Sequence, residues 1–271
     1  MKRFAVIGDP IDHSLSPILH NWVYKQLGIE AVYEKINVKS AKVSTFVNSI
    51  RNGDFNGINV TSPHKMKIVD YVDEINPRAK IIGSVNFLIN HNNKIIGNNT
   101  DWYGFILALR KNKISLNDRE VIVIGSGGVT KSVIFALKHL GARKINLFNR
   151  SYNKIKDFKT NKISPHRLKN LSSFIKESSI IINCTTIGML SNQSPLDSSL
   201  LTSSQIVIDS IYNPLSTKLI LDAKKNNAIT VSGLDMFIFQ ALASIDLWFG
   251  EGTTNKVNFE ELKGHIEMHL C

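Results

Sequence analysis

The sequence is poor in the residues that form covalent or metal-held frameworks. Its 271 residues include two cysteines, Cys184 and Cys271, and its eight histidines show no Cys-x-x-Cys or His-Glu-x-x-His spacing. This excludes a disulfide-stapled fold and gives no metal-ligand motif. No segment approaches the roughly 20 apolar residues of a membrane span, and the apolar run 4–7 is too short for a signal peptide. We therefore expect a soluble, reduced, cytoplasmic protein with no metal and no membrane partner.

Positive charge is in excess but is not concentrated. Lys and Arg number 33 against 22 Asp and Glu, which gives a formal net charge of +11 and a pI of about 9.6. The basic residues are mostly single, with no run beyond pairs such as Lys224-Lys225. Nucleic-acid-binding proteins cluster their cations, so we expect no nucleic-acid partner. Attraction of an anionic cofactor or substrate and a solvated Lys-rich surface both stay open as explanations.

The first part of the chain alternates strand and helix signals. The length allows two domains, and 43% hydrophobic with 20% charged residues is a globular composition. The expected strands are 4–7, 31–37 and 57–61, and the expected helices are 16–27 and 43–50. Residues 81–89 and 95–96 are expected to be extended, on either side of a turn at 91–93. This alternation predicts an α/β sheet.

A second unit is predicted to begin after Asp101, with a helix at 102–109. The apolar run 121–124 is typical of a strand buried on both faces. A Gly-rich turn, a helix to Leu140 and four more strands at 144–148, 180–183, 206–209 and 229–231 predict a doubly wound, Rossmann-like sheet. The expected fold is two-domain α/β. Residues 1–101 form a substrate-binding domain on which helices within 237–271 pack back, and residues 102–236 form a nucleotide-binding domain.

Lys65 breaks the local rules of its segment. After the strand, Ser62-Pro63 predicts a helix, with Ser62 as N-cap and Pro63 at the first position. Lys65 would lie in the first turn, where the helix dipole disfavours a cation, and on the apolar stripe of that helix. Such breaks concentrate at functional sites. A lysine with a buried stem and a solvated amine is the alternative.

The Gly-rich turn lies between a strand and a helix, which is the context of a dinucleotide site. Gly125 allows a tight turn, Gly127 lets the backbone approach a pyrophosphate, and the helix N-terminus offers free N–H groups. Thr130 occupies the usual third glycine position, and Gly128 is shifted. A plain turn would also explain the pattern, but the strand–helix–strand unit around it favours a cofactor.

The end of the next strand selects the cofactor. An NAD site normally has an Asp or Glu there for the ribose 2′-hydroxyl, whereas this chain has Asn149-Arg150-Ser151 and then Lys154. The planar guanidinium of Arg150 matches a 2′-phosphate and can stack on adenine. NADP is therefore predicted, although a surface role for Arg150 stays open.

Several polar residues lie where strands end or helices begin. A structural role explains each one taken singly: capping for Ser14, Ser16 and Asp101, turn formation for Asn59 and Asn86, solvation for Gln240, and packing for Tyr212.

Taken together, these residues belong to an ordered series of motifs that resembles the shikimate dehydrogenase family. The series is Gly8-Asp9-Pro10-Ile11-Asp12-His13-Ser14-Leu15-Ser16-Pro17 with His20-Asn21, Asn59-Val60-Thr61-Ser62-Pro63-His64-Lys65, Gly83-Ser84-Val85-Asn86, Asn98-Asn99-Thr100-Asp101, Gly125-Ser126-Gly127-Gly128, Asn149-Arg150-Ser151, Asn183-Cys184-Thr185-Thr186-Ile187-Gly188-Met189, Asp209-Ser210-Ile211-Tyr212-Asn213-Pro214, Gly233-Leu234-Asp235-Met236 and Gln240. The motifs follow the family's order and span nearly the whole chain. The departures from the family pattern are Phe87 for Thr, Ser84 and Ser126 for Ala, and Ser62 for an apolar residue.

The resemblance implies a role for each matching position. Lys65 and Asp101 are the implied catalytic pair. The implied substrate-binding residues are Ser14, Ser16, Asn59, Thr61, Lys65, Asn86, Asp101, Tyr212 and Gln240. The implied cofactor-binding residues are Gly125, Ser126, Gly127, Gly128, Val129, Asn149, Arg150, Ser151, Lys154, Thr185, Met189, Ile211, Gly233 and Met236.

The reaction implied by the resemblance is the reversible, NADPH-dependent reduction of 3-dehydroshikimate to shikimate, in aromatic amino-acid biosynthesis. The residue types suit it, because an ammonium near a carbonyl that gains hydride stabilises the developing negative charge and can donate a proton. Which member of the Lys65–Asp101 pair gives the proton stays open. The active site is expected between the two domains, in a monomer or a homodimer.

Two other readings stay open. One is a quinate/shikimate dehydrogenase that prefers NAD, against which Arg150 and the missing acid argue. The other is a catalytically silent NADP-binding regulator, which could have discarded Lys65 and Asp101, yet both are present.

Overall fold

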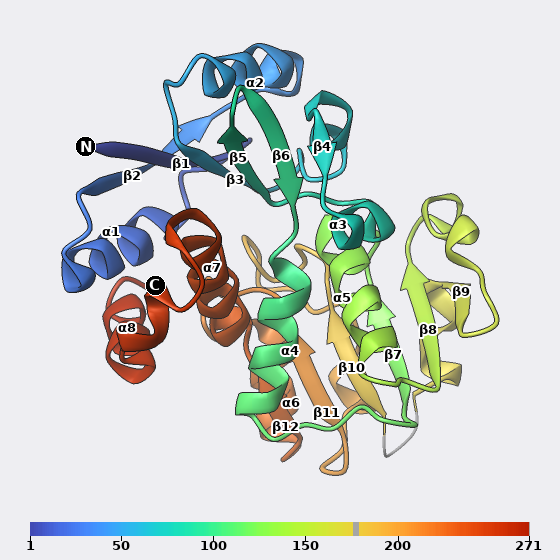
Figure 1. The fold of residues 1–271 in the computed structure, drawn as a ribbon. Helices are drawn as coiled ribbons and strands as arrows, with labels where there is room; N and C mark the ends of the chain where they lie inside the picture. Colours follow the sequence, from blue (N-terminus) through green and yellow to red (C-terminus); the bar gives the residue numbers. More distant parts are fainter. Residues whose placement is uncertain (176–178, 271) are drawn as a thin grey trace. The chain divides into compact units, whose positions relative to one another are not determined.

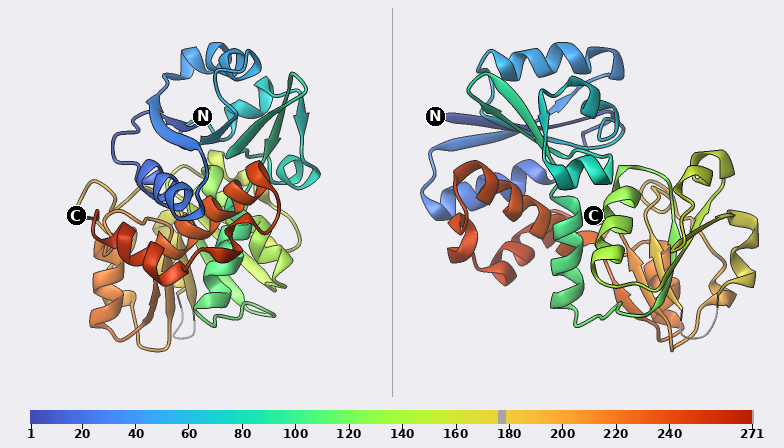
Figure 2. Two further views of the ribbon diagram at one scale, coloured as in Figure 1. Left: turned by 60° about the vertical axis from the view of Figure 1, so that its left-hand side comes forward. Right: turned by 45° about the vertical axis from the view of Figure 1, so that its right-hand side comes forward.

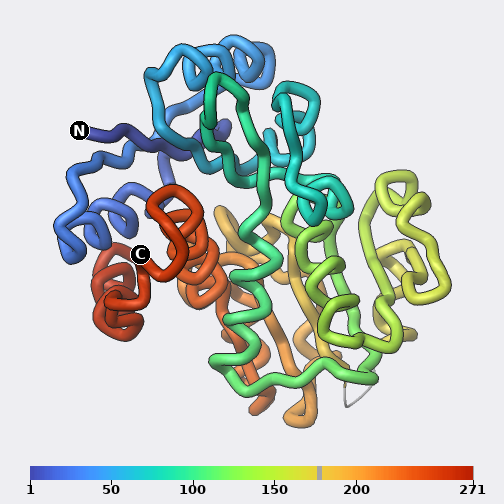
Figure 3. The backbone as a smooth tube through the Cα atoms, viewed as in Figure 1, coloured from blue at the N-terminus to red at the C-terminus, as the bar shows by residue number. Residues whose placement is uncertain are grey.

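The structure is a computed structural model that describes residues 1–175 and 179–270. Within them the chain forms two compact units (Figure 1). The first unit comprises residues 1–104 and 238–269, and the second comprises 105–237 with Leu270. The chain passes between the units within two helices, α4 (Asp101–Lys111) and α7 (Gly233–Phe249), and its course can be followed in Figure 3. Cys271 lies outside the described residues.

The first unit has a mixed sheet of six strands in the order β2-β1-β3-β5-β6-β4. β1 pairs in parallel with β2 and β3, and β5 is antiparallel to both of its neighbours. The strands are β1 (Lys2–Gly8), β2 (Ala31–Asn37), β3 (Gly57–Val60), β4 (Glu74–Ile75), β5 (Phe87–His91) and β6 (Lys94–Asn98).

Helices cover both faces of this sheet. α2 (Val43–Arg51) lies on one side, and α1 (Ser16–Leu27) and α8 (Phe259–Glu267) lie on the other (Figure 2). The alternation of strand side chains sorts the residues of β3 between the two layers. Ile58 joins the core under α2, whereas Gly57 faces Trp248 of α7.

The second unit has an all-parallel sheet in the order β12-β11-β10-β7-β8-β9, the strand order of a doubly wound dinucleotide-binding fold. α5 (Gly128–His139) covers one face and α6 (Lys218–Lys225) the other (Figure 1). The strands are rich in Ile and Val because both faces are buried. They are β7 (Glu120–Ile124), β8 (Lys144–Asn149), β9 (Ile163–Arg167), β10 (Ile180–Asn183), β11 (Ile206–Asp209) and β12 (Ile229–Val231).

Two local predictions were wrong, and the strands β4 and β9 were not predicted. No α-helix begins at Ser62-Pro63, because the chain turns through Lys65 and forms only the 3₁₀ segment η2 (Lys67–Tyr71). The Lys65 carbonyl accepts from Val85 N at 2.8 Å, a long-range bond that replaces the helical one. The start of the 81–89 segment is not extended, because α3 (Pro77–Ile82) begins at an Asn76 cap and ends at Gly83 in a left-handed conformation.

The contact between Gly57 and Trp248 generates a stability prediction. A Cβ at residue 57 would lie 2.1 Å from the indole Nε1, which donates to Leu88 O at 3.2 Å. We expect Gly57→Ala to lower the free energy of unfolding by about 1–3 kcal/mol, the range of overpacked cores. Urea titration followed by tryptophan fluorescence measures it, since all three tryptophans lie in the first unit.

Gly264→Ala is the matched control. Its Cβ would meet open space in helix α8, so it should stabilise the protein by up to about 1 kcal/mol. Equal stability of Gly57→Ala and the unsubstituted protein would contradict the packing described for Trp248.

Candidate functional site

The sheet of the first unit brings distant segments to one edge. β1 and β3 are parallel, β5 starts at the edge where they end, and β6 returns to it. The bonds Thr61 N to Ile7 O and Val60 N to Asn86 O, each 2.9 Å, fix this junction. Four segments of the edge carry predicted site residues: Ser14 and Ser16, Thr61 and Lys65, Asn86, and Asp101.

Lys65 and Asp101 form an ion pair at this edge. Lys65 Nζ lies 2.7 Å from Asp101 Oδ2, and the two side chains are 12% and 5% exposed. Asp101 Oδ1 accepts from Asn86 Nδ2 at 2.9 Å. Removing both charges from water is costly, and good geometry with extra hydrogen bonds is needed to offset it. The Asp101 carboxylate therefore binds the Lys65 amine through one oxygen, while the Asn86 amide fixes its other oxygen.

Asn86 is locked by its own amide. Its Oδ1 accepts from Thr100 N at 2.7 Å, and its Nδ2 donates to Thr100 Oγ1 at 2.9 Å and to Asp101. Gln240 Oε1 lies 3.4 Å from the same nitrogen, the longest of these contacts. Gln240 is partly buried, so solvation does not explain it. Three predicted site residues thus meet around one amide group.

A second polar cluster supports Asn86 from behind. Asn59 Nδ2 donates to Asn86 O at 3.1 Å and to Ser244 Oγ at 3.0 Å, while Asn59 Oδ1 accepts from the Tyr33 hydroxyl at 2.7 Å. Both amide hydrogens of Asn59 are used within the protein. A direct contact of Asn59 with a substrate stays a prediction, whereas its support of Asn86 is a feature of the structure.

The sequence did not single out Tyr33 or Ser244. Tyr33 lies in a β-strand and Ser244 in a helix, and neither position carries a local signal. The His20 ring stacks on Tyr33 at 3.9 Å and 6°. Burial lowers the pKa of His20 to about 3, so at neutral pH it is an uncharged platform beneath that ring.

Ser14 and Ser16 contact each other, with Ser14 Oγ donating to Ser16 Oγ at 3.2 Å and accepting from Ser16 N at 3.3 Å. Capping does not explain Ser16, because Leu15 is the N-cap of α1 and Ser16 its first helical residue. Phe87, the departure from the family pattern, is 2% exposed and stacks on Trp248 at 5.1 Å. The core therefore accommodates the Phe87 side chain.

The glycine turn of the second unit follows β7. Gly125 has φ +139°, and a Cβ there would lie 2.9 Å from Cys184 O, so glycine is required. Gly127 has open space around it and caps α5 without a side-chain hydrogen bond. The Thr130 hydroxyl beside the turn is buried and has no hydrogen-bond partner within the described part of the chain. The N-terminus of α5 has no side-chain cap, and the space beside Gly127 leaves its N–H groups accessible. Both features fit a pyrophosphate.

The carboxyl ends of the parallel strands carry the other predicted cofactor residues. At the end of β8, Asn149 Nδ2 donates to Ser151 O at 2.9 Å and shapes the turn that presents Arg150, and Lys154 ends a 3₁₀ turn. Ligands of doubly wound sheets bind along this edge. The remaining residues there follow β7, β10, β11 and β12: Ser126, Gly128, Val129, Thr185, Met189, Ile211, Gly233 and Met236.

Two buried polar residues, Asn183 and Asp209, connect these strand ends. No role was predicted from the sequence for either of them. Asn183 Oδ1 accepts from Thr185 N and Oγ1 at 3.0 and 2.7 Å, and Asn183 Nδ2 donates to Asp209 Oδ1 at 3.1 Å. Asp209 also accepts from Ile211 N at 3.1 Å and Thr217 Oγ1 at 2.7 Å. A polar residue ending an all-apolar strand was the signal that could have found both.

Tyr212 and Cys184 lie in the second unit. Tyr212 stacks on Phe237 at 4.0 Å in the second unit, so its role near a substrate carboxylate stays a prediction. Burial raises the pKa of the Cys184 thiol, which is therefore no thiolate nucleophile. Among the residues that the structure describes, no three potential ligands are grouped so that they could hold a metal, and none of the helices has the length and hydropathy of a membrane span.

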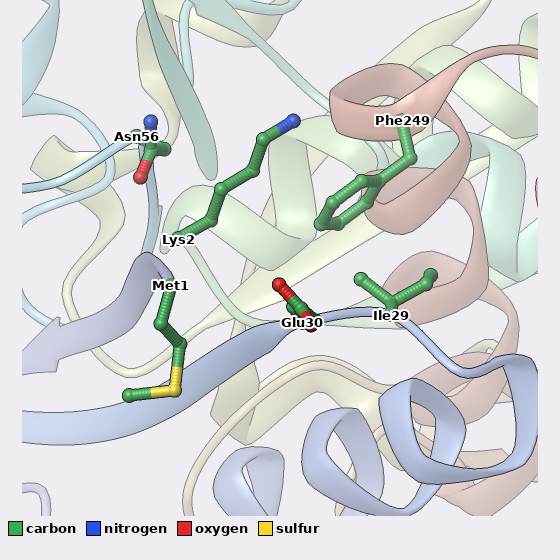
Figure 4. Close-up of a pocket in the computed structure, with 6 residues that line it drawn as sticks. All are labelled: Met1, Lys2, Ile29, Glu30, Asn56 and Phe249. Atoms are coloured by element: carbon green, nitrogen blue, oxygen red, sulfur yellow. The ribbon is translucent and has the colours of Figure 1, made fainter.

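A hollow of about 450 Å³ at the start of the chain contains none of the predicted site residues (Figure 4). Its lining is Met1, Lys2, Ile29, Glu30, Asn56 and Phe249. Lys2 lies over the Phe249 ring, with its Nζ 5.1 Å from the ring centroid. This hollow is therefore no part of the candidate site.

The fold and the glycine turn define an α/β protein with a Rossmann-like unit. Residues 6–88 match the family model of the shikimate dehydrogenase substrate binding domain, and residues 107–231 match that of shikimate / quinate 5-dehydrogenase. The chain therefore belongs to the shikimate dehydrogenase family.

Individual relatives agree with this assignment. A shikimate dehydrogenase (NADP(+)) of Bacillus cereus is 38% identical over 259 residues, 92% of this chain and 94% of that protein. The solved shikimate dehydrogenase of Aquifex aeolicus has a TM-score of 0.89 at 29% identity, covering 98% and 97% of the two chains. That of Thermus thermophilus, solved with NADP(H) and shikimate, has a TM-score of 0.85 at 27% identity and full coverage of both chains.

Asp209 generates a pH prediction. Burial raises the pKa of its carboxyl to about 6, although three hydrogen bonds oppose the shift. Between pH 4 and 6 the folded protein then binds more protons than the unfolded chain, so this group's contribution to stability falls as pH rises. Asp209→Asn removes the titration. The melting temperature of the variant relative to the unsubstituted protein should rise from pH 4 to pH 7, with a free-energy change of about 3 kcal/mol at most.

Asp197→Asn is the control for this experiment, because hydrogen bonds from Ser199 lower the pKa of Asp197. Its relative melting temperature should fall, slightly, over the same pH range. A relative melting temperature of Asp209→Asn that does not change with pH would show that Asp209 does not titrate in this way.

Proposed function

We propose that this protein catalyses the reversible, NADPH-dependent reduction of 3-dehydroshikimate to shikimate, as an NADP-dependent shikimate dehydrogenase. The observation that carries the proposal is the Lys65–Asp101 ion pair, with a distance of 2.7 Å between Nζ and Oδ2. It is supported by a relative that matches 92% of this chain and is named shikimate dehydrogenase (NADP(+)). The Thermus thermophilus relative was solved with both shikimate and NADP(H). The proposal places the enzyme in aromatic amino-acid biosynthesis and in the cytoplasm, as a monomer or homodimer.

The residues of the first unit supply binding and proton transfer. Lys65 places a positive charge beside the oxygen that becomes an alkoxide on reduction, and either it or Asp101 delivers the proton. Asn86 keeps the carboxylate oriented, so the pair needs little rearrangement at the moment of reaction. Ser14, Ser16, Thr61, Gln240 and Tyr212 are the proposed partners of the substrate's hydroxyl and carboxylate groups.

The residues of the second unit fit NADP. When bound, the cofactor supplies the hydride. The open turn at Gly127 and the first N–H groups of α5 would hold its pyrophosphate, and Arg150 and Lys154 its 2′-phosphate. Thr185, Met189, Ile211, Gly233 and Met236 are proposed to border the nicotinamide half. No acid follows β8 in the position that an NAD site needs.

A spectrophotometric assay tests the proposal. The purified protein with shikimate and NADP should generate absorbance of reduced NADP, with NAD a much poorer acceptor. Quinate is assayed in parallel, since one matching family model carries both substrate names. Faster turnover of quinate with NAD would replace the proposal by the quinate alternative, and binding of shikimate and NADP without turnover would favour a silent regulator.

Substitution of Lys65 tests the role of the ion pair. Lys65→Ala should lower kcat about 10²-fold or more, the scale of a general acid–base contribution. Lys67→Ala is the matched control, because Lys67 is exposed and its amine donates to Ser40 O at 3.3 Å. It should retain kcat within about twofold. Near-unchanged kcat in a folded Lys65→Ala variant would falsify the proton-transfer role.

A further inference from the structure

A basic hollow lies at the carboxyl edge of the second sheet. It has a volume of about 380 Å³ and is lined by Arg150, Arg167, Leu168 and Lys169. Sequence reasoning gave a role only to Arg150. We propose that Arg167, assisted by Lys169, forms a second wall of the 2′-phosphate site opposite Arg150, and so determines the preference for NADP over NAD. The inference rests on the proposed function and extends its cofactor site.

The topology places Arg167 beside the predicted cofactor turn. β8 and β9 are parallel neighbours, and Asn149 at the end of β8 is the register partner of Arg167 at the end of β9. Both strand ends therefore lie at the edge where doubly wound sheets bind nucleotides. Arg150 and Arg167 are the first basic residues that the chain places at these two neighbouring strand ends.

Side-chain contacts aim Arg167 towards the turn. Its guanidinium carbon lies 5.7 Å from the ring centroid of Tyr152, two residues beyond Arg150. Stacking of a guanidinium on an aromatic ring restrains its plane and leaves its edge N–H groups free to donate. Leu168 packs against the core of the unit and anchors the backbone between Arg167 and Lys169.

The charge of the hollow is of one sign. Arg150, Arg167 and Lys169 are exposed, and none of them forms an ion pair with a carboxylate in the part of the chain that the structure describes. A phosphate monoester carries close to two negative charges and three acceptor oxygens. Two guanidinium groups with an ammonium match it, whereas an uncharged ribose 2′-hydroxyl gains little from them.

Calorimetric titration of the full chain with NADP and with NAD tests the inference. Arg167→Gln should raise the Kd for NADP about tenfold, equivalent to 1.4 kcal/mol, and change the Kd for NAD less than about twofold. Arg167→Lys should fall between these values because it keeps the charge and loses the fork. Lys169→Gln should give a smaller loss in the same direction. Lys162→Gln, an exposed cation just before the opposite end of β9, should leave both Kd values within about twofold.

The outcomes separate this inference from the proposed function. An unchanged NADP affinity in Arg167→Gln, or equal losses for NADP and NAD, would overturn the role of Arg167 even if the protein oxidises shikimate. A protein that binds NADP but does not oxidise shikimate would overturn the proposed function, and the NADP-to-NAD ratio of the variants would still decide the role of Arg167. An unsubstituted protein that binds NAD at least as tightly as NADP would overturn the inference.

Discussion

The pair of opposite charges at Lys65 and Asp101 is the constraint on which the first unit depends. Both side chains are almost removed from water, so the fold must give each charge compensating contacts. Three strand junctions meet this need, because Lys65 follows β3, Asn86 precedes β5 and Asp101 follows β6. The reversed direction of β5 in an otherwise parallel sheet brings Asn86 to the edge where Lys65 and Asp101 lie. A fully parallel arrangement of the same strands would place Asn86 at the opposite edge.

Behind the charge pair, the packing of α7 on the sheet fixes the polar cluster. Side chains of β3 alternate between the two helical layers, so Asn59 meets Ser244 on the same face where Gly57 admits Trp248. The indole requires the space that a side chain at residue 57 would fill. A buried amide with unpaired polar atoms would cost about 1–3 kcal/mol. The Tyr33 hydroxyl removes part of that cost by donating to Asn59 Oδ1, and Ser244 Oγ removes part by accepting from Asn59 Nδ2. The packing of Trp248 against Gly57 and the hydrogen bond between Asn59 and Ser244 therefore require the same position of α7.

The sequence predicted most elements of the fold because their signals are local. The apolar runs of β10 and β11 end at polar residues, Asn183 and Asp209, and α1 ends before Gly28. Each of these boundaries follows from the residue type at that position. The helix predicted at Ser62 was wrong because the Lys65 carbonyl bonds to Val85 N, a partner that no local pattern reveals. The Asn76-Pro77 start of α3 and its stop at Gly83 are local signals, so this helix is predictable from the sequence. For the site, motif order supplied the members, but Tyr33 and Ser244 act only through contacts between distant segments.

Electrostatics at the second sheet divides into a part that attracts any dinucleotide and a part that can discriminate between two. The α5 N-terminus offers backbone N–H groups, and these interact with a pyrophosphate that NAD and NADP share. Discrimination between NAD and NADP must come from side chains that reach the ribose. The exposed cations Arg150, Arg167 and Lys169 lie together at the ends of β8 and β9. The cations at this edge therefore match a dinucleotide, and their presence does not require a nucleic-acid partner. A small number of cations placed at two neighbouring strand ends can convert a general anion site into one that selects a third phosphate.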